Sequence, residues 1–181
     1  MYTNGWGVPE DYKEAMKWYL KAAEQGDALG QNSLGLMYEN GWGVAKDLKE
    51  AVQWYRKAAE QRNAAGQNNL GWSYVEGHGV GKDYKTGLYW TKKAVEQGNA
   101  WGENNLGHMY GRGYGVHRDY AEALKWYLKG AEQGDTMAQY NIGYAYKYGH
   151  GVAKDRNEAK KWLQKGADQG YEDAKKELLR R

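Results

Sequence analysis

The chain has 181 residues, enough for one domain with a substantial core, and its 26 basic and 23 acidic side chains leave a net charge of +3. This balance argues against a nucleic-acid partner, and the absence of cysteine excludes disulfides and cysteine-based metal sites. No apolar run approaches the roughly 20 residues needed to cross a bilayer, and the first residues do not resemble a signal peptide. We therefore expect a cytoplasmic protein, or a periplasmic one if a leader precedes this sequence.

A unit of 36 residues recurs along the chain without an insertion or deletion. The motif G-x-G-V begins once in each unit, at Gly5, Gly41, Gly77, Gly113 and Gly149. A tryptophan keeps the same period, at Trp18, Trp54, Trp90, Trp126 and Trp162. A period of this length in five registered copies predicts a repeat architecture.

The first predicted element of each unit, helix B, follows the G-x-G-V motif. Asp47 is a good N-cap, and Glu50 three residues later predicts a capping box. Helices of this type are expected at residues 11–25, 47–61, 83–97, 119–133 and 155–169. A glycine follows four of them, at Gly26, Gly98, Gly134 and Gly170, where a left-handed residue ends a helix. Arg62 occupies this place in the second unit, so we expect strain there or a different helix ending.

The second predicted element, helix A, shows apolar and small residues at three- and four-residue spacing, as in Ala64, Leu70 and Tyr74. Helices of this type are expected at residues 27–39, 63–75, 99–111, 135–147 and 171–180. Neither short helix can bury its apolar face alone, so the pairs predict an all-α solenoid of about ten stacked, antiparallel helices over residues 1–181. Residues 1–10 are expected to end an incomplete unit, and residues 171–181 to form a C-terminal cap.

The full pattern A-x-x-Q-x-x-L-G-x-x-Y-x-x-G-x-G-V-x-x-D-x-x-x-A-x-x-W-x-x-K-A-A-x-Q-G resembles the Sel-one-like repeat family, a relative of the tetratricopeptide repeats. The resemblance implies a right-handed α-solenoid of a kind that acts as an adaptor in signalling, quality control, secretion and bacterial host contact. Cysteine-rich periplasmic members are disfavoured, because this chain lacks their cysteines. The incomplete first unit suggests part of a longer array, or self-association through the N-terminal face, or a natural short protein whose first helix is self-sufficient.

In a tetratricopeptide-like solenoid, one face of each helix A lines a concave groove. At about 100° per residue, four sequence positions of helix A share that face. The candidate partner-binding residues are Leu29, Asn32, Leu36, Ala65, Asn68, Trp72, Trp101, Asn104, His108, Met137, Tyr140 and Tyr144. Amides pair with a peptide backbone and large rings supply contact area, so an extended peptide is the expected guest. The adjacent row, Ser33, Asn69, Asn105 and Asn141, would bind either the guest or the neighbouring repeat.

The middle residue of the G-x-G turn is a ring in every unit. This edge row consists of Trp6, Trp42, His78, Tyr114 and His150. The rings either extend a binding surface or pack between successive turns, and packing is the preferred expectation.

Catalysis has little support in the sequence. No two of the four histidines have the i,i+4 spacing of a helical metal site, and no nucleophile motif occurs, so we expect no enzyme, metal or cofactor. The periodic Lys21, Lys57, Lys93, Lys129 and Lys165 suggest a phosphate ladder, but the helix dipole alone favours cations there. The preferred function is a protein-interaction scaffold or adaptor. The alternatives are an immunity or adaptor protein for a secreted toxin, and a glycan or peptidoglycan binder, since Trp, Tyr and Asn also suit sugars.

Overall fold

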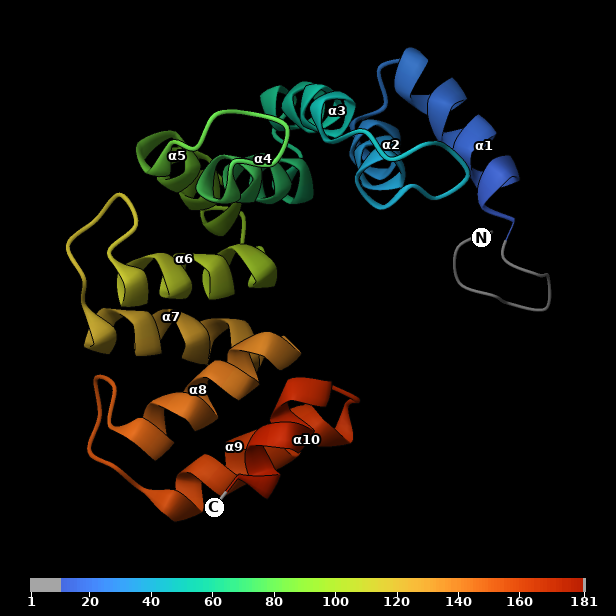
Figure 1. The fold of residues 1–181 in the computed structure, drawn as a ribbon. Coiled ribbons are helices and arrows are strands. Elements are labelled where there is room, and N and C mark those ends of the chain that lie inside the picture. Colours follow the sequence, from blue (N-terminus) through green and yellow to red (C-terminus); the bar gives the residue numbers. More distant parts are fainter. Residues whose placement is uncertain (1–10, 181) are drawn as a thin grey trace. The chain divides into compact units, whose positions relative to one another are not determined.

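The computed structural model describes residues 11–180, and these residues form ten α-helices and no strand (Figure 1). The helices are α1 (Tyr12–Glu24), α2 (Ala28–Asn40), α3 (Leu48–Glu60), α4 (Ala64–Glu76), α5 (Tyr84–Val95), α6 (Ala100–Arg112), α7 (Tyr120–Glu132), α8 (Thr136–Tyr148), α9 (Arg156–Asp168) and α10 (Glu172–Leu179). Odd-numbered helices are of the B type and even-numbered helices of the A type. The predicted all-α fold of stacked helix pairs is confirmed, and each observed helix end lies within two residues of the expected one.

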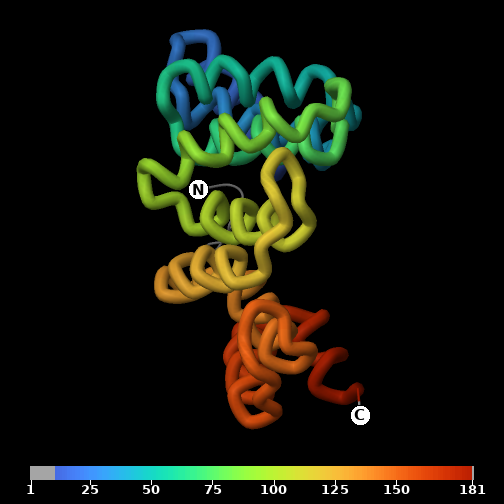
Figure 2. The backbone as a smooth tube through the Cα atoms, turned by 90° about the vertical axis from the view of Figure 1, so that its left-hand side faces the viewer, coloured from blue at the N-terminus to red at the C-terminus, as the bar shows by residue number. Residues whose placement is uncertain are grey.

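The helices fall into two compact units, where the sequence analysis treats residues 1–181 as one solenoid. Unit 1 ends at Ala94 and contains α1 to α4 and all but the last residue of α5, and unit 2 begins at Val95 and contains α6 to α10. Within unit 2, α6 and α7 lie side by side along their length, as both views of the chain show (Figure 1; Figure 2).

The N-caps of helix B act as predicted, but the capping box is only half formed. The Asp47 carboxylate accepts the backbone N–H of Glu50 at 3.0 Å. The Glu50 carboxylate does not bond back to the cap residue; it accepts the indole N–H of Trp54 at 3.1 Å instead. The reason is that the Asp47 N–H donates to the carbonyl of Tyr38, in the preceding helix, at 2.9 Å. The prediction of a full capping box is therefore wrong.

Four of the periodic lysines of helix B lie over the tryptophan one turn before them: Lys21, Lys57, Lys129 and Lys165. The Lys57 ammonium is 3.7 Å from the centre of a Trp54 ring, and Lys129 is 4.2 Å from Trp126. Such cation–π contacts contribute about 0.5–1 kcal/mol at exposed sites. They provide a structural reason for the lysine row, in addition to the helix dipole.

The second glycine of three G-x-G turns, Gly43, Gly79 and Gly151, packs directly on the preceding repeat. Gly43 has a φ of 69°, and a Cβ there would overlap the carbonyl oxygen of Tyr12. A Cβ on Gly79 would overlap the carbonyl of Leu48, and one on Gly151 that of Tyr120. Only glycine combines a left-handed conformation with this close approach. The turn therefore packs against the backbone of the first residue of helix B in the preceding repeat.

Unit 2 ends in a buried carboxylate. Glu177 is only 2% exposed and accepts hydrogen bonds from the Lys147 ammonium at 2.7 Å and the Tyr148 hydroxyl at 2.9 Å. Burial opposes ionisation of Glu177, but the bonds from Lys147 and Tyr148 outweigh it and hold its pKa below the usual value. Leu179, by contrast, is 84% exposed. The expected incomplete unit at residues 1–10 lies outside the described residues; Trp18, in the first described helix, is 53% exposed.

Arg62 is the one non-glycine residue of the described chain with a positive φ, at 62°. It takes the position of Gly98 and Gly134, so the strained ending that the sequence suggests is present. A left-handed conformation costs a residue with a side chain roughly 1–2 kcal/mol. We expect Arg62→Gly to raise the free energy of unfolding by about 1 kcal/mol in urea denaturation followed by circular dichroism.

The matched reverse change is Gly134→Ala, which should lower the free energy of unfolding by a similar amount. A Cβ at Gly134 meets no atom within 4 Å, so only the backbone conformation is affected. Equal or lower stability of Arg62→Gly would show that the side chain makes a compensating contribution.

Candidate functional site

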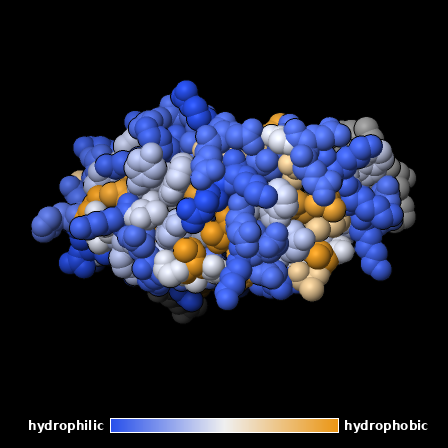
Figure 3. All heavy atoms as spheres, turned by 90° about the horizontal axis from the view of Figure 1, so that it is seen from above, coloured by the Kyte–Doolittle hydropathy of each residue, from blue (hydrophilic) through white to orange (hydrophobic). Residues whose placement is uncertain are grey.

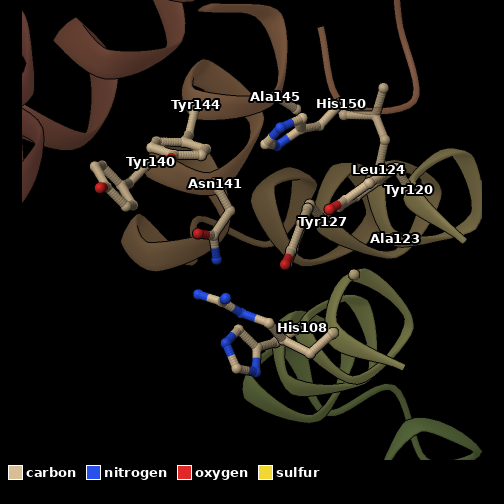
Figure 4. Close-up of a pocket in the computed structure, with 12 residues that line it drawn as sticks. His108, Tyr120, Ala123, Leu124, Tyr127, Tyr140, Asn141, Tyr144, Ala145 and His150 are labelled. Atoms are coloured by element: carbon tan, nitrogen blue, oxygen red, sulfur yellow. The ribbon is translucent and has the colours of Figure 1, made fainter. Parts of the chain in front are cut away.

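A pocket of about 400 Å³ lies in unit 2, between α6, α7 and α8 (Figure 4). Four tyrosines, two histidines, an arginine and an asparagine line it, together with small and aliphatic residues. The tyrosines are Tyr120, Tyr127, Tyr140 and Tyr144. Such a volume falls within the range of small-ligand sites in proteins.

The pocket brings together five of the residues that the sequence analysis singles out. His108, Tyr140 and Tyr144 come from the predicted groove, and His150 comes from the edge row. Arg112, Tyr120 and Tyr127 were not candidates, and Asn141 was placed in the adjacent row. Tyr120 and Tyr127 lie on helix B, from which no partner-binding candidate was drawn.

Two small residues open the pocket where the other repeats carry larger ones. Gly111 stands in the position of Glu39, Val75 and Lys147, and Ala145 in that of Met37, Ser73 and Met109. Val75, Met37 and Met109 are at most 1% exposed, so in their own repeats these side chains fill space. Replacing such residues by glycine and alanine leaves room beside the rings, because the backbone register stays fixed.

Stacked rings form one wall of the pocket. The imidazole of His150 stacks on Tyr120 with 4.6 Å between ring centres and an interplanar angle of 13°. Tyr144 lies 5.7 Å from His150 and 6.1 Å from Tyr140. These contacts hold the rings in place before any guest arrives, which reduces the entropy that binding costs.

Each polar side chain of the pocket can donate a hydrogen bond, although the phenols, imidazoles and amide also accept. Its lining includes the guanidinium of Arg112 and the phenol of Tyr127 but no Asp or Glu. Burial raises the pKa of Tyr127 and the nearby Arg112 charge lowers it, with a net increase. The phenol is therefore a protonated donor at neutral pH.

The predicted groove row of asparagines is buried and not outward-facing. Asn32, Asn68 and Asn104 are 8%, 5% and 4% exposed. The Asn69 side-chain amide donates to the Asn32 oxygen at 2.9 Å, and Asn141 donates to Asn104 at 2.8 Å. The outward placement of this row is wrong, because the three side chains are buried and a buried amide needs a partner, which Asn32 and Asn104 find on the next helix A of their own unit. For Asn69 and Asn141, the alternative of bonding to the neighbouring repeat is confirmed.

The remaining groove candidates differ in exposure. Leu29, Trp101 and Met137 are 67%, 57% and 40% exposed. The half-buried candidates are Leu36, Ala65 and Trp72, of which Leu36 packs against the core of unit 1. On the face drawn in Figure 3, hydrophobic side chains form separate patches among hydrophilic ones. A role of these residues in partner binding stays a prediction.

Two rings of the edge row pack on helix B of the preceding repeat. Trp42 stacks on Tyr12 with 5.5 Å between ring centres, as His150 does on Tyr120. Tyr114 meets His108 edge-on at 5.8 Å, and His78 is exposed. Trp6 lies outside the described residues. The observed stacking therefore joins a turn to a helix, and it is not stacking of edge-row rings on one another.

Within residues 11–180, no cluster of three His, Asp or Glu side chains is placed to hold a metal ion. None of the helices in this range has the length and apolar character that spanning a bilayer requires.

Comparison with known proteins gives a family and several similar structures. The family model described as Sel1 repeat matches residues 1–27, 28–63, 64–99, 102–135 and 136–171. The comparison with curated proteins found no match. A Sel1 repeat protein from Oxalobacter formigenes is 42% identical with a TM-score of 0.86, over 98% of this chain and 70% of that chain.

Two further structures are informative. The protective antigen c5321 of uropathogenic Escherichia coli, which displays the SLR fold, is 44% identical with a TM-score of 0.76, over 98% of this chain and 38% of that chain. The immunity protein PA5088 from Pseudomonas aeruginosa is 25% identical with a TM-score of 0.63, over 88% of this chain and 58% of that chain.

A buried carboxylate in α6 provides a test of the polar contacts between repeats. Glu103 is 7% exposed and accepts the Gln133 amide at 2.7 Å, as the neutral Gln31 accepts Gln61 at 2.7 Å. Burial raises the pKa of Glu103 above the usual value of 4.5, although the Gln133 bond partly opposes this. The ionised carboxylate thus destabilises the fold above its raised pKa, and this penalty disappears as the pH falls toward 4.5.

We expect Glu103→Gln to raise the free energy of unfolding at pH 7 by roughly 1 kcal/mol, the usual size of a single-residue effect. The advantage over wild type should shrink on acidification and vanish near pH 4.5. Urea denaturation of both proteins across this range measures it. A difference that is constant with pH would contradict the assignment.

Proposed function

Because the chain belongs to the Sel1 repeat family, whose members are generally protein-interaction scaffolds, we propose that it is a non-catalytic scaffold that binds a peptide segment of a partner protein on unit 2. The supporting observation is the 400 Å³ pocket lined by rings and hydrogen-bond donors between α6, α7 and α8. Tyrosine side chains of this kind are common energetic centres of protein interfaces.

The surface near the pocket suits an extended guest. Trp101 lies two turns before His108 on α6, and Met137 lies two turns before Tyr144 on α8, so each pair shares a helix face. Trp101 and Met137 are exposed. A peptide across these two helices would place one side chain in the pocket and rest its neighbours on the exposed apolar residues.

A second candidate is an immunity or adaptor protein, in which the bound partner is a secreted toxin. The observation that favours it is the similarity to the immunity protein PA5088, at a TM-score of 0.63. This function uses the same kind of surface and differs only in the partner.

The pocket can be filled without disturbing the fold, and this tests the proposal. A Cβ at Gly111 would lie 3.7 Å from both the Ala123 Cβ and the Tyr127 hydroxyl, which is ordinary contact. Gly111→Met places an unbranched side chain in the pocket, with the reach of Glu39 in its own repeat. Both Met and Ala are better helix formers than Gly, so neither change should unfold α6.

Peptides selected on the wild-type protein from a random library should bind Gly111→Met at least about tenfold more weakly, the loss typical of a central interface contact. Binding to Gly111→Ala, the matched control, should be nearly unchanged. Fluorescence anisotropy of the labelled peptides measures both. The proposal fails if no peptide is selected or if both variants bind like wild type, and a tryptophan fluorescence response to muropeptides alone would favour a glycan binder.

A further inference from the structure

Two equivalent tyrosines in the repeats have different hydroxyl partners. In unit 1, the Tyr55 hydroxyl donates to the Glu39 carboxylate at 2.5 Å. Tyr127 holds the same position two repeats later, and Gly111 stands where Glu39 would be. In the part of the chain that the structure describes, the Tyr127 hydroxyl has no hydrogen-bond partner. The pocket therefore contains the hydroxyl of Tyr127 as an available donor, whereas the equivalent hydroxyl of Tyr55 is paired with a carboxylate.

That donor lies beside Gly111 in the lining of the pocket. The Tyr127 hydroxyl would be 3.7 Å from a Cβ on Gly111, the position from which the Glu39 side chain extends in its own repeat. The Tyr127 hydroxyl and the Asn141 amide face the space between α6 and α8 in the close-up (Figure 4). The space that a glutamate side chain at position 111 would occupy is thus adjacent to the Tyr127 hydroxyl.

The charge of the pocket matches an anion. Arg112 is the one formally charged side chain of the lining, and among the described residues it forms no ion pair. The same chain shows how such a pair of groups acts, because Glu177 is held by the Tyr148 hydroxyl and the Lys147 ammonium together. Hydrogen bonds to an ionised group are about twice as strong as neutral ones.

We propose that the pocket of unit 2 binds a carboxylate group of the partner peptide, with the Tyr127 hydroxyl as its hydrogen-bond donor and Arg112 as its counter-charge. The rings of Tyr144 and His150 contact the carbon chain that carries the carboxylate. The carboxylate is either an Asp or Glu side chain or the C-terminus of the partner. This inference rests on the proposed function, since it names the group that the peptide-binding site recognises.

Small probes test the chemistry without a known partner. N-acetyl-glutamate α-amide carries a side-chain carboxylate, N-acetylglycine carries a main-chain one, and N-acetyl-glutamine α-amide is the neutral match of the first. In NMR titrations, one or both carboxylates should shift the ring signals of Tyr127 and His150. The glutamine derivative should bind about tenfold more weakly or not at all, because it loses a charged hydrogen bond. The stronger of the two carboxylates identifies the source.

Tyr127→Phe removes the donor and keeps the ring that packs on Gly107. It should weaken the preferred carboxylate about tenfold and the glutamine derivative less, because a neutral amide accepts a weaker hydrogen bond. Tyr55→Phe, the matched control, breaks the bond to Glu39 and should leave probe binding as in wild type. Circular dichroism verifies the fold of both variants.

The inference is overturned if neither carboxylate binds, if the glutamine derivative binds as well as the glutamate derivative, or if Tyr127→Phe binds like wild type. Equal binding of inorganic phosphate also overturns it, since Arg112 would then attract any anion. Selected peptides that depend on Gly111 but need neither an acidic side chain nor a free C-terminus would keep the proposed function while removing this inference.

Discussion

The close contact between a G-x-G turn and the preceding helix B, seen at three turns, is the constraint on which the repeat depends. At Gly43, Gly79 and Gly151 the backbone lies so near the carbonyl of the earlier helix that no Cβ fits, and each φ is positive. A second such contact places Gly107 of helix A against the ring of Tyr127, where a Cβ would be 2.7 Å from a ring carbon. An inserted residue would break these contacts, which explains why the 36-residue spacing is kept without exception.

A fixed backbone register leaves side-chain size and charge as the means of building a site. In unit 2, Gly111 and Ala145 stand where other repeats carry larger residues, and a pocket of about 400 Å³ is the consequence. Because Gly111 has no side chain, Tyr127 lacks the carboxylate partner that Glu39 provides for Tyr55 in unit 1. The pocket and its available donor thus have one origin.

The helices and part of the site could be predicted from the sequence, because caps and glycines recur at fixed positions. The spacing of about 100° per residue predicts that His108, Tyr140 and Tyr144 share one face of their helices, and all three line the pocket. It fails for Asn32 and Asn104, since a single helix does not reveal that Asn69 and Asn141 of the next helix A bond to them. Tyr127 was missed because the candidates came only from helix A and the G-x-G turns; the signal is Gly111 in the position of Glu39, visible only when repeats are compared position by position.

The most direct test of this account is a crystal structure of the Gly111→Glu variant. If the pocket is the space left by a missing glutamate, the introduced carboxylate will accept the hydroxyl of Tyr127, as Glu39 accepts that of Tyr55 at 2.5 Å, and will fill the pocket. A carboxylate turned to solvent, with the pocket still open and the Tyr127 hydroxyl unpaired, would contradict it.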